Sequence, residues 1–468
     1  MSTDILPQPR VVLNTHVRIT DAPADVVQQL IDTSTFANPV FLEAQKQGRS
    51  TFDIPATRKY WSWDRNDTLV VPRGLWPGLK PLLGNAIIVE DHRVLLPFIA
   101  FGWRGPHLFA FQKSALDSAM PHDHGLLVGP CGCGKTNWLA AVIAKRRQRA
   151  LVIVPTKQLL AQTRDRFLEL WNVDSEAVGI IGDGHWELGS HATVALPHTL
   201  RLRDLSALRD QFGLVACDES HLAAAPLFEE VLQQFPAYYR IGVTATPTRR
   251  DGMEGLVSAV LGPIVAKISM DDLVAADRLV RPTVHQVPSS FAYPYSKEYA
   301  KLLTALTTDS DRNQLIANLA IREARAGHQV LVLSERVAHV EQLGSLIGEH
   351  TSDLTVAVVT GSTTAKRREA AIDDTRSGMV QILLATRLAD LGLDVPSLDR
   401  LILASGGRHA GRITQQLGRI MRAQVSKHAV VFDIIDPGSP ILAAQAKARL
   451  WQVYKPLGAH VIREGVPA

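Results

Sequence analysis

The sequence is poor in cysteine, with only Cys131, Cys133 and Cys217 in 468 residues. So small and odd a number argues against a disulfide framework and favours a reducing compartment. Cys131 and Cys133 stand one residue apart, as half of a metal site could, but no second Cys or His pair at ligand spacing accompanies them. We therefore expect three thiols and no metal site built on them.

Long apolar runs are also absent. No stretch approaches the roughly 18–20 apolar residues that are needed to cross a bilayer. The first ten residues, MSTDILPQPR, lack the basic start and the apolar stretch of a signal peptide. Both absences lead us to expect a cytoplasmic protein without a membrane partner.

Neither sign of charge dominates, because 50 Lys and Arg face 46 Asp and Glu for a net charge of +4. This balance permits a polyanionic partner without demonstrating one. The chain is 46% hydrophobic and 21% charged, which excludes a largely disordered or collagen-like protein. Its length favours about three domains.

Residues 1–86 read as a small α+β module. A helix is expected over 22–32, and a hairpin of residues 58–63 and 68–71 around a turn-forming Asp-Arg-Asn-Asp sequence. If 58–63 is one strand, Lys59, Trp61 and Trp63 share a face. Aromatic and basic side chains can stack on unpaired nucleotides. Tryptophans on one strand face are more often core, which is the interpretation we favour here, although the module as a whole is expected to help bind DNA.

The rest of the chain alternates short apolar runs with longer helical stretches, and the pattern restarts after Pro282. Such alternation predicts parallel sheets that are covered by helices. We expect two α/β domains in tandem, over residues 87–281 and 282–468. The expected strands are 125–128, 150–154, 214–217, 240–243, 329–333, 356–359, 381–385 and 400–404. The expected helices are 137–146, 157–171, 313–326, 337–349 and 366–377.

The strongest motif is GPCGCGKT, which begins at Gly129 and matches G-x-x-x-x-G-K-[ST] between a strand and a helix. Its glycines, Gly129, Gly132 and Gly134, let backbone N–H groups surround phosphates. Lys135 should reach the β- and γ-phosphates, and the Thr136 hydroxyl should bind Mg²⁺. A chance glycine-rich turn would not be expected to carry the lysine, the threonine and both flanking elements.

An apolar run that ends in Asp218-Glu219 supplies the acidic groups that a phosphate loop requires. Asp218 would face the metal, and Glu219 would orient and deprotonate an attacking water. By itself this pair could equally be the acidic start of a helix. Together with the phosphate loop, the catalytic interpretation is favoured.

Asp218-Glu219-Ser220-His221 resembles the D-E-x-H box of superfamily 2 helicases of the DEAD/DEAH-box type, and the order of motifs over residues 100–460 is similar to that of the XPB-like and UvsW-like DNA helicases. This resemblance implies two RecA-like domains with ATP between them, and a Phe111-Gln112 motif in which Gln112 reads adenine. Four further segments resemble, in this order, motifs Ia, III, V and VI of the family. They are Pro155-Thr156-Lys157-Gln158-Leu159, Thr244-Ala245-Thr246-Pro247, Ala385-Thr386 with Gly392-Leu393-Asp394, and Gln415 through Arg422.

The resemblance also implies residue roles. Arg419 and Arg422, with Gln415, would act on the γ-phosphate of ATP. The remaining implied roles are as follows: Gly392 and Asp394 bind the nucleotide, Thr244 and Thr246 couple the ATP and nucleic-acid sites, and Thr156, Lys157 and Thr386 contact the phosphodiester backbone.

The function expected from these motifs is an ATP- and Mg²⁺-dependent helicase or translocase acting on double-stranded, forked or branched DNA. An RNA helicase is one alternative. Another is a remodelling ATPase that works with a partner nuclease, because the sequence contains no nuclease motif of its own.

All three thiols fall near the predicted nucleotide site. A helix N-terminus tends to lower the pKa of a thiol, so oxidation or alkylation of the loop could stop ATP hydrolysis. The alternative, which we favour, is that the cysteines are small residues selected for packing.

Overall fold

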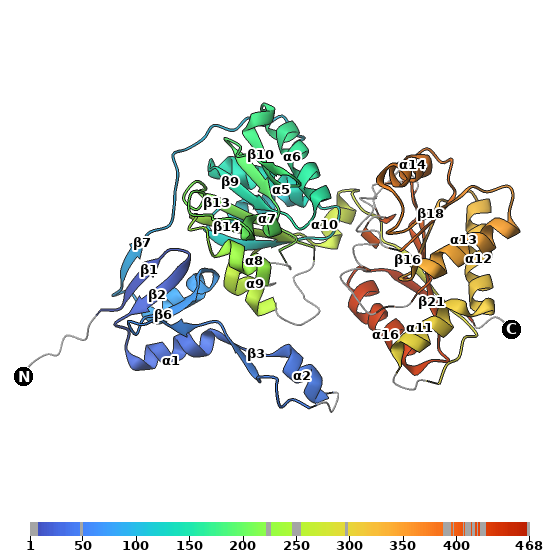
Figure 1. Ribbon diagram of the computed structural model, residues 1–468, viewed down its shortest axis with the longest axis horizontal. Coiled ribbons are helices and arrows are strands. Elements are labelled where there is room, and N and C mark those ends of the chain that lie inside the picture. The colour runs from blue at the N-terminus through green and yellow to red at the C-terminus, as the bar shows by residue number, and fades with distance from the viewer. Residues whose placement is uncertain are drawn as a thin grey trace, which may run out of the picture. The chain divides into compact units, whose positions relative to one another are not determined.

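The computed structural model (Figure 1) describes residues 8–46, 50–220, 226–245, 254–294, 298–386, 395, 397–405, 407, 413, 417–418, 420–421 and 427–465. The chain forms two compact units, Met1–Ser269 and Met270–Ala468. The first unit contains a small mixed sheet and a large parallel sheet, and the second unit contains another parallel sheet. The predicted fold class is confirmed: two tandem RecA-like domains with an N-terminal α+β module.

The N-terminal module is built on a five-stranded sheet with the order β5-β6-β2-β1-β7. The neighbours are antiparallel except β1 and β7, which run parallel. Val11, Val17, Leu30 and Val71 form its core with Trp76. Its strands are β1 (Arg10–Leu13), β2 (His16–Thr20), β5 (Ser62–Trp63), β6 (Leu69–Pro72) and β7 (Ile88–Asp91), and its helical segments are α1 (Ala24–Thr33), η1 (Arg73–Leu75), α3 (Trp76–Leu79) and η2 (Lys80–Leu83).

The expected strand over residues 58–63 is wrong, because the chain changes sheets at Tyr60. β4 (Thr57–Lys59) pairs with β3 (Thr35–Ala37) in a separate ribbon that also carries α2 (Pro39–Lys46), and only β5 pairs with β6. Trp61 packs against the module core and donates its Nε1–H to a threonine hydroxyl at 2.9 Å. Trp63 is 46% exposed. The core interpretation therefore holds for Trp61 and fails for Trp63.

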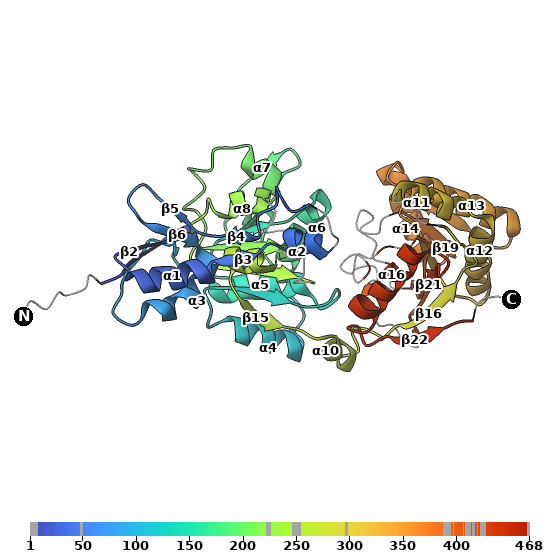
Figure 2. The ribbon, with the colours of Figure 1, turned by 90° about the horizontal axis from the view of Figure 1, so that it is seen from below.

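The large sheet of the first unit has eight strands in the order β11-β10-β12-β9-β13-β14-β8-β15, and only β11 runs antiparallel to its neighbour. Helices α7, α8 and α9 contribute to the core on one face, and α4, α5 and α6 pack together on the other, with α4 beside β15 (Figure 2). The strands are β8 (His124–Val128), β9 (Ala150–Ile153), β10 (Val178–Gly182), β11 (His185–Trp186), β12 (Ala192–Ala195), β13 (Leu214–Asp218), β14 (Tyr239–Thr244) and β15 (Ile264–Lys267). The helices are α4 (Ala110–Ala119), α5 (Lys135–Arg146), α6 (Lys157–Trp171), η3 (Ser175–Ala177), α7 (Pro197–Arg201), α8 (Pro226–Leu232) and α9 (Glu254–Leu261).

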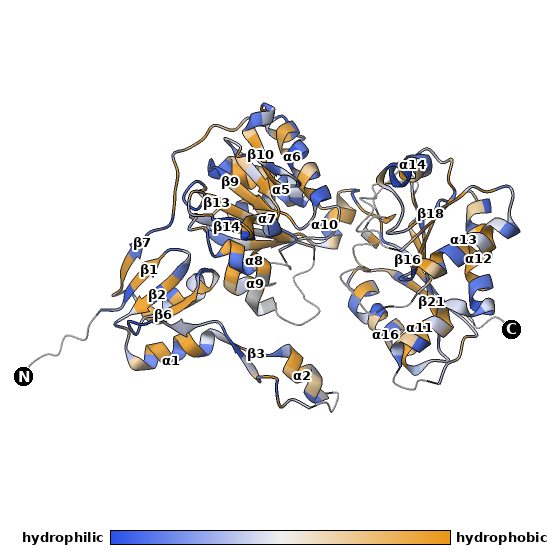
Figure 3. Ribbon diagram, viewed as in Figure 1, coloured by the Kyte–Doolittle hydropathy of each residue, from blue (hydrophilic) through white to orange (hydrophobic). Residues whose placement is uncertain are grey.

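The second unit has a parallel seven-stranded sheet with the order β18-β19-β17-β20-β21-β16-β22. Its strands are strongly apolar (Figure 3), as a sheet buried on both faces requires. The strands are β16 (Thr283–Pro288), β17 (Val330–Leu333), β18 (Val356–Val359), β19 (Ile382–Ala385), β20 (Arg400–Leu403), β21 (Val430–Ile435) and β22 (His460–Arg463). The helices are α10 (Met270–Ala275), α11 (Tyr299–Thr308), α12 (Ser310–Arg325), α13 (Val337–His350), α14 (Ala365–Arg376), α16 (Pro440–Arg449) and η6 (Leu450–Tyr454).

Two fully buried arginines join the N-terminal module to the eight-stranded sheet. Arg73 donates to the carbonyls of Asn14 and Ala237 at 3.0 and 2.7 Å. Arg240, on β14, donates to the carbonyl of Thr15 in the module at 3.3 Å, and also to carbonyls at and just after the end of α8. Next to Arg73, a Cβ on Gly74 would lie 2.5–2.6 Å from backbone atoms at the end of α9. The module therefore packs against the sheet with its backbone in direct contact.

Within the described part of the chain, no helix is both long enough and apolar enough to span a bilayer.

Candidate active site

The described nucleotide residues that were predicted in the first unit lie at the carboxyl edge of the eight-stranded sheet. β8 ends immediately before the phosphate loop, β13 ends at Asp218, and β14, which lies between them, ends at Thr244. The strand register aligns Val128 with Thr244, and Asp218 with Val243. Neighbouring strands lie about 4.8 Å apart, so the loop and Asp218 begin roughly 10 Å apart. A nucleotide's phosphates and a metal ion can span that separation.

The phosphate loop depends on its glycines for its backbone path. Gly132 and Gly134 have φ values of +87° and +77°, which favour glycine. The N–H of Gly129 donates to the carbonyl of Thr244 at 3.0 Å, so the loop is attached to β14. α5 begins at Lys135, and its N-terminal N–H groups therefore face the space that the loop encloses.

Lys135 lies over the loop, where its Nζ donates to the carbonyls of Gly129 and Pro130 at 3.3 and 3.4 Å. Burial alone would lower the pKa of this ammonium group. The negative charges that Cys131 and Cys133 carry once ionised, together with the nearby carboxylates, outweigh that effect and raise the pKa above its usual value. Lys135 therefore stays charged at neutral pH, as an electrostatic contact with phosphate requires.

The two carboxylates are separated by a sharp turn of the backbone. Asp218 is buried at the end of β13, and its Oδ1 accepts the N–H of Glu219 at 2.8 Å. Glu219 itself has a φ of +51°. A non-glycine residue in this left-handed region costs about 1 kcal/mol, and such strain concentrates at functional sites.

Gln112 contacts the phosphate loop directly. Its side chain is 3% exposed. Oε1 accepts the N–H of Phe109 at the start of α4, and Nε2 donates to the carbonyl of Cys133 at 2.8 Å. A Cβ on Gly134 would lie 2.3 Å from Nε2, so the amide packs closely against the loop. The amide therefore supports the loop, whether or not it also reads adenine.

These groups fit a nucleoside triphosphate with Mg²⁺. The left-handed glycines and the start of α5 suit phosphate oxygens, and the Lys135 ammonium suits their charge. Mg²⁺ is commonly held by one or two carboxylates together with substrate phosphates. Thr136, in the first turn of α5, and Asp218 are the residues that would hold it.

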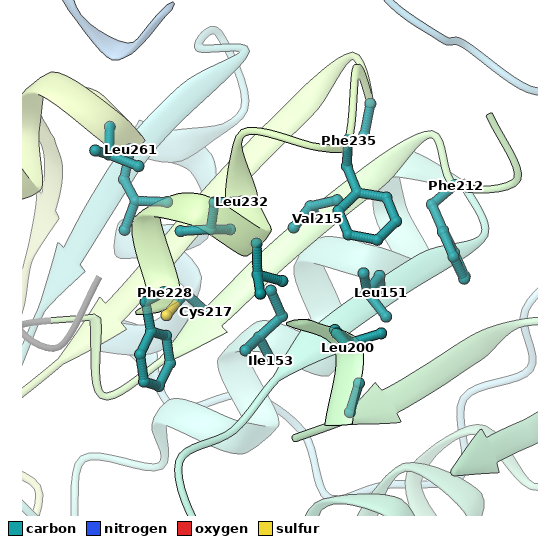
Figure 4. Close-up of a cluster of buried hydrophobic side chains, with 14 of the residues drawn as sticks. Leu151, Ile153, Leu200, Phe212, Val215, Cys217, Phe228, Leu232, Phe235 and Leu261 are labelled. Atoms are coloured by element: carbon teal, nitrogen blue, oxygen red, sulfur yellow. The ribbon is translucent and has the colours of Figure 1, made fainter. Parts of the chain in front are cut away.

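Two of the three cysteines are packed in the interior. Cys217 is 0% exposed and lies in a cluster with Phe228 and Ile153 (Figure 4). Cys133 is 1% exposed, and burial raises the pKa of both thiols. The start of α5 therefore does not lower the pKa of the Cys133 thiol, and both buried cysteines fit the packing interpretation. Cys131 is partly exposed.

The candidate nucleic-acid residues lie at strand ends in both units. In the first unit, the Thr156 hydroxyl caps α6 by accepting the N–H of Leu159 at 3.2 Å. Lys157 is exposed and pairs with Asp183 at 2.5 Å. In the second unit, Thr386 directly follows β19 and is partly exposed. Lys157 could exchange its partner for a phosphate, whereas Thr156 already has a structural role.

Several predicted site residues cannot be placed, because they lie outside the described residues: Thr246, Gly392, Asp394, Gln415, Arg419 and Arg422. Near Gln415, Arg419 and Arg422 in the sequence, four residues are described and all four are buried: Ile413, Leu417, Ile420 and Met421. The Met421 carbonyl accepts the N–H of Val280 at 2.8 Å, which fixes that point of the chain within its unit.

Sequence reasoning missed a polar depression at the carboxyl end of β18. Its lining residues are Glu341, Val358, Thr360, Ser362, Thr363, Thr364 and Arg367. The hydroxyls of Thr360 and Ser362 lie 2.8 Å apart, and the Thr363 hydroxyl accepts the N–H of Thr360 at 2.9 Å. The signal was present in the sequence as a run of hydroxyl residues before a helix with an arginine in its first turn.

A phosphate loop, a strand-end carboxylate pair and two RecA-like parallel sheets together define a P-loop enzyme that hydrolyses ATP. Comparison with known proteins extends this definition. Residues 106–249 match the family described as "Type III restriction enzyme, res subunit", and residues 311–424 match the "Helicase conserved C-terminal domain". The chain belongs to the superfamily 2 helicases.

The chain is 25% identical to "DNA 3'-5' translocase XPB2" of Sulfurisphaera tokodaii, over 70% of this chain and 81% of that protein. It is 29% identical to "DNA 3'-5' helicase XPB" of Kineococcus radiotolerans, over 69% of this chain and 58% of that protein. Among solved structures, its fold is similar to an "ATP-dependent Type ISP restriction-modification enzyme LlaBIII bound to DNA", with a TM-score of 0.57 and 17% identity over 77% of this chain and 32% of that chain. The chain thus spans about three-fifths of the length of the bacterial XPB helicase.

Proposed function

We propose that this chain is an ATP-dependent DNA helicase or translocase. The proposal rests on the meeting of the phosphate loop, Asp218 and Glu219 at one sheet edge, in a chain whose relatives are named DNA 3'-5' translocase and helicase. An RNA helicase and a remodelling subunit that needs a partner nuclease are the alternatives that the experiment below must exclude.

In this proposal, the first unit supplies the groups that surround the triphosphate. The loop amides and Lys135 hold the β- and γ-phosphates, and Thr136 and Asp218 hold Mg²⁺, which neutralises charge on the phosphates when it is bound. Glu219 accepts a proton from the attacking water. Thr244, whose carbonyl holds the loop at Gly129, transmits changes in the loop to β14.

The second unit supplies Gln415, Arg419 and Arg422, which stabilise charge on the γ-phosphate. An arginine in this role typically contributes about 10³–10⁵ in rate. Gly392 and Asp394 contribute to nucleotide binding, and Thr246 continues the coupling segment that begins at Thr244.

DNA would be held mainly through its backbone. Lys157 and Thr156 in the first unit, and Thr386 with the hydroxyl-lined depression near Arg367 in the second, suit phosphodiester oxygens. Such contacts are independent of sequence and weaken with salt. The exposed Trp63 of the N-terminal module could stack on an unpaired base.

The test is ATP hydrolysis by the full chain with double-stranded, forked or single-stranded DNA, or with RNA. We expect DNA to stimulate hydrolysis more than RNA. Lys135→Ala should abolish hydrolysis, and Glu219→Gln should bind Mg-ATP but hydrolyse it very slowly, because an amide cannot accept the proton. Glu187→Gln, which changes an exposed glutamate of the same unit, is the matched control.

Other outcomes favour the alternatives. Stimulation by RNA alone would identify an RNA helicase. Hydrolysis that needs an added nuclease, whatever the nucleic acid, would identify a remodelling subunit. Near-normal turnover by Glu219→Gln would contradict its proposed role as the base.

A further inference from the structure

The outer edge of the eight-stranded sheet carries a tight hairpin. β10 turns into β11 through Asp183 and Gly184, which have φ values of +51° and +90°. Two-residue hairpins of this kind require positive φ at both turn positions, and Asp-Gly is a preferred pair for them. β11 is the last strand in the order of the sheet, and its second residue is Trp186. The hairpin therefore presents this indole at the sheet edge on a backbone of defined path.

Trp186 lies on the face of the sheet to which α7 and α8 contribute. It pairs with Ile181 of β10, and side chains that are directly opposite in a ladder point to the same face. Ile181 is buried in the core of that face, and Leu188 packs against the same core. Trp186, by contrast, is 41% exposed. Its neighbours on this face thus supply the core, while much of the indole remains in solvent.

Two cationic side chains from different segments lie beside the hairpin. The guanidinium carbon of Arg203, two residues after α7 ends, lies 5.5 Å from the centre of the Trp186 ring, within the range of a cation–π contact. The ammonium group of Lys157, at the start of α6, pairs with Asp183 at the hairpin tip. These segments follow β12 and β9, which run parallel to β10. The indole and both cations therefore meet at the carboxyl edge of the sheet.

The carboxylates near the hairpin have local partners. Asp183 is paired with Lys157, and Oε1 of Glu187 lies 3.2 Å from Nδ1 of His185. Asp204 accepts a main-chain N–H and a hydroxyl, both at 2.9 Å. The pair of Lys157 with Asp183 is exposed, and exposed pairs contribute little to stability. Lys157 can therefore exchange its carboxylate for a phosphate at small cost.

An exposed indole with cations beside it suits an unpaired nucleotide. A nucleobase can stack on the aromatic ring, and an arginine beside the ring adds attraction to the base. The Cα atoms of Asp183 and Trp186 are separated by at most roughly 10 Å of strand, so the ammonium at the hairpin tip lies within reach of a phosphate next to the stacked base. A duplex offers no such base, because its bases already stack on one another.

We propose that Trp186, with Arg203 beside it and Lys157 at the hairpin tip, is a stacking site for an unpaired base of single-stranded DNA. The site gives the first unit a preference for single-stranded over duplex DNA. This inference rests on the proposed function and deepens it, since it names the form of DNA that the first unit holds.

The test is the binding of the full chain to three DNAs at fixed salt: a single strand, the blunt duplex of that strand, and a strand of abasic nucleotides. Trp186→Ala should weaken binding to the single strand about 5- to 150-fold, the range expected for one stacked base. Binding to the duplex and to the abasic strand should change less than about twofold, because neither offers an unstacked base. Trp186→Phe, which keeps an aromatic ring, should retain most of the affinity.

Lys157→Ala should act differently, because a phosphate contact needs no base. It should weaken binding to the normal and the abasic strand by the same factor, and reduce the slope of log Kd against log salt by about 0.7.

The matched control is Trp451→Ala. Trp451 is 56% exposed and has the Lys455 ammonium 3.6 Å from the centre of its ring, so it offers similar chemistry. It lies in η6, at the end of the helical connection from β21 to the parallel strand β22, and therefore toward the amino edge of its sheet. Trp451→Ala should bind all three DNAs as the unmodified chain does.

Three results would overturn the inference. In the first, Trp186→Ala lowers the melting temperature but keeps all three affinities, which would make the indole a cover for the core. In the second, it weakens binding to the abasic strand as much as to the normal strand. In the third, Trp451→Ala loses the same factor. Failure of the unmodified chain to bind any of the DNAs, or to hydrolyse ATP with any nucleic acid, would instead overturn the proposed function.

Discussion

Replacing Gln112 by alanine separates two roles for this residue. Its resemblance to the helicase glutamine motif implies that it reads adenine, whereas its contacts in the structure support the phosphate loop. The substitution removes the hydrogen bond to the carbonyl of Cys133 and the bond from the N–H of Phe109. The two roles predict different losses for ATP and for a nucleotide with another base.

The size of the effect follows from burial. The carbonyl of Cys133 would lose a 2.8 Å bond from a side chain that is 3% exposed. Leaving a buried polar group without a partner costs about 1–3 kcal/mol. If that cost falls on the loop conformation that binds phosphate, kcat/KM should fall roughly 5- to 150-fold. In the proposed function the loop would contact the phosphates and not the base, so ATP and GTP should lose the same factor.

The assay is kcat/KM for ATP and GTP with the unmodified chain and Gln112→Ala. Gln148→Ala is a matched control. The Gln148 amide lies just before β9 and is also buried; it accepts the N–H of Leu96 at 2.8 Å and donates to the carbonyls of Leu96 and Arg147 at 2.9 and 3.4 Å. Gln148→Ala should reduce the free energy of unfolding without changing kcat/KM per folded molecule. A loss confined to ATP would refute the loop-support reasoning and establish adenine reading.

Three further predictions follow from packing. Gly74→Val should separate the N-terminal module from the sheet, since the new Cβ would meet backbone atoms at 2.5–2.6 Å. Limited proteolysis should then cut between the module and the sheet, and an unchanged digestion pattern would contradict this prediction. Burial, with a nearby arginine, lowers the pKa of His339 from 6.5 to about 3, so the native chain binds fewer protons than the unfolded chain between these values and loses stability as the pH falls through them. From pH 7 to pH 5, the free energy of unfolding measured with urea should fall by about 2 kcal/mol less in His339→Gln than in the unmodified chain. Equal pH dependence in the two proteins would disprove this role of His339. Maleimide should label Cys131 before the buried Cys133, and Mg-ATP should slow that labelling; equal rates for the two thiols would refute the packing interpretation.

The structure also changes what is expected of a chain that starts near residue 87. Because the sequence predicts that residues 1–86 form a module of their own, a chain without them would be expected to keep ATP hydrolysis and to bind forked DNA more weakly. Removing the module would take away the partner of Arg240 at Thr15 and expose the end of α9 that packs on Gly74. We therefore expect truncation to destabilise the first unit, and point substitutions are the better test of DNA binding by the module.

Local sequence determined most of the fold and the centre of the candidate site. The helix expected over 157–171 and the strand over 356–359 have those bounds in the structure, because the helix has a clear apolar period and the strand is a short apolar run between polar residues. The phosphate loop could also be predicted from the sequence, since eight consecutive residues specify both its backbone path and its charges. The end of the strand at Asp218 and Glu219 could be predicted because an apolar run stops at two carboxylates.

Contacts between distant segments decided the rest. Lys59, Trp61 and Trp63 alternate as a strand would, yet competing partners divide them between two sheets. The bond from Gln112 to the loop spans 21 residues, and the pair of Lys157 with Asp183 spans 26. A periodic pattern shows which face of an element is buried, but it carries no information about which other element covers that face. The sequence by itself therefore determined the chemistry of the phosphate loop, and tertiary packing determined which buried groups hold that loop in place.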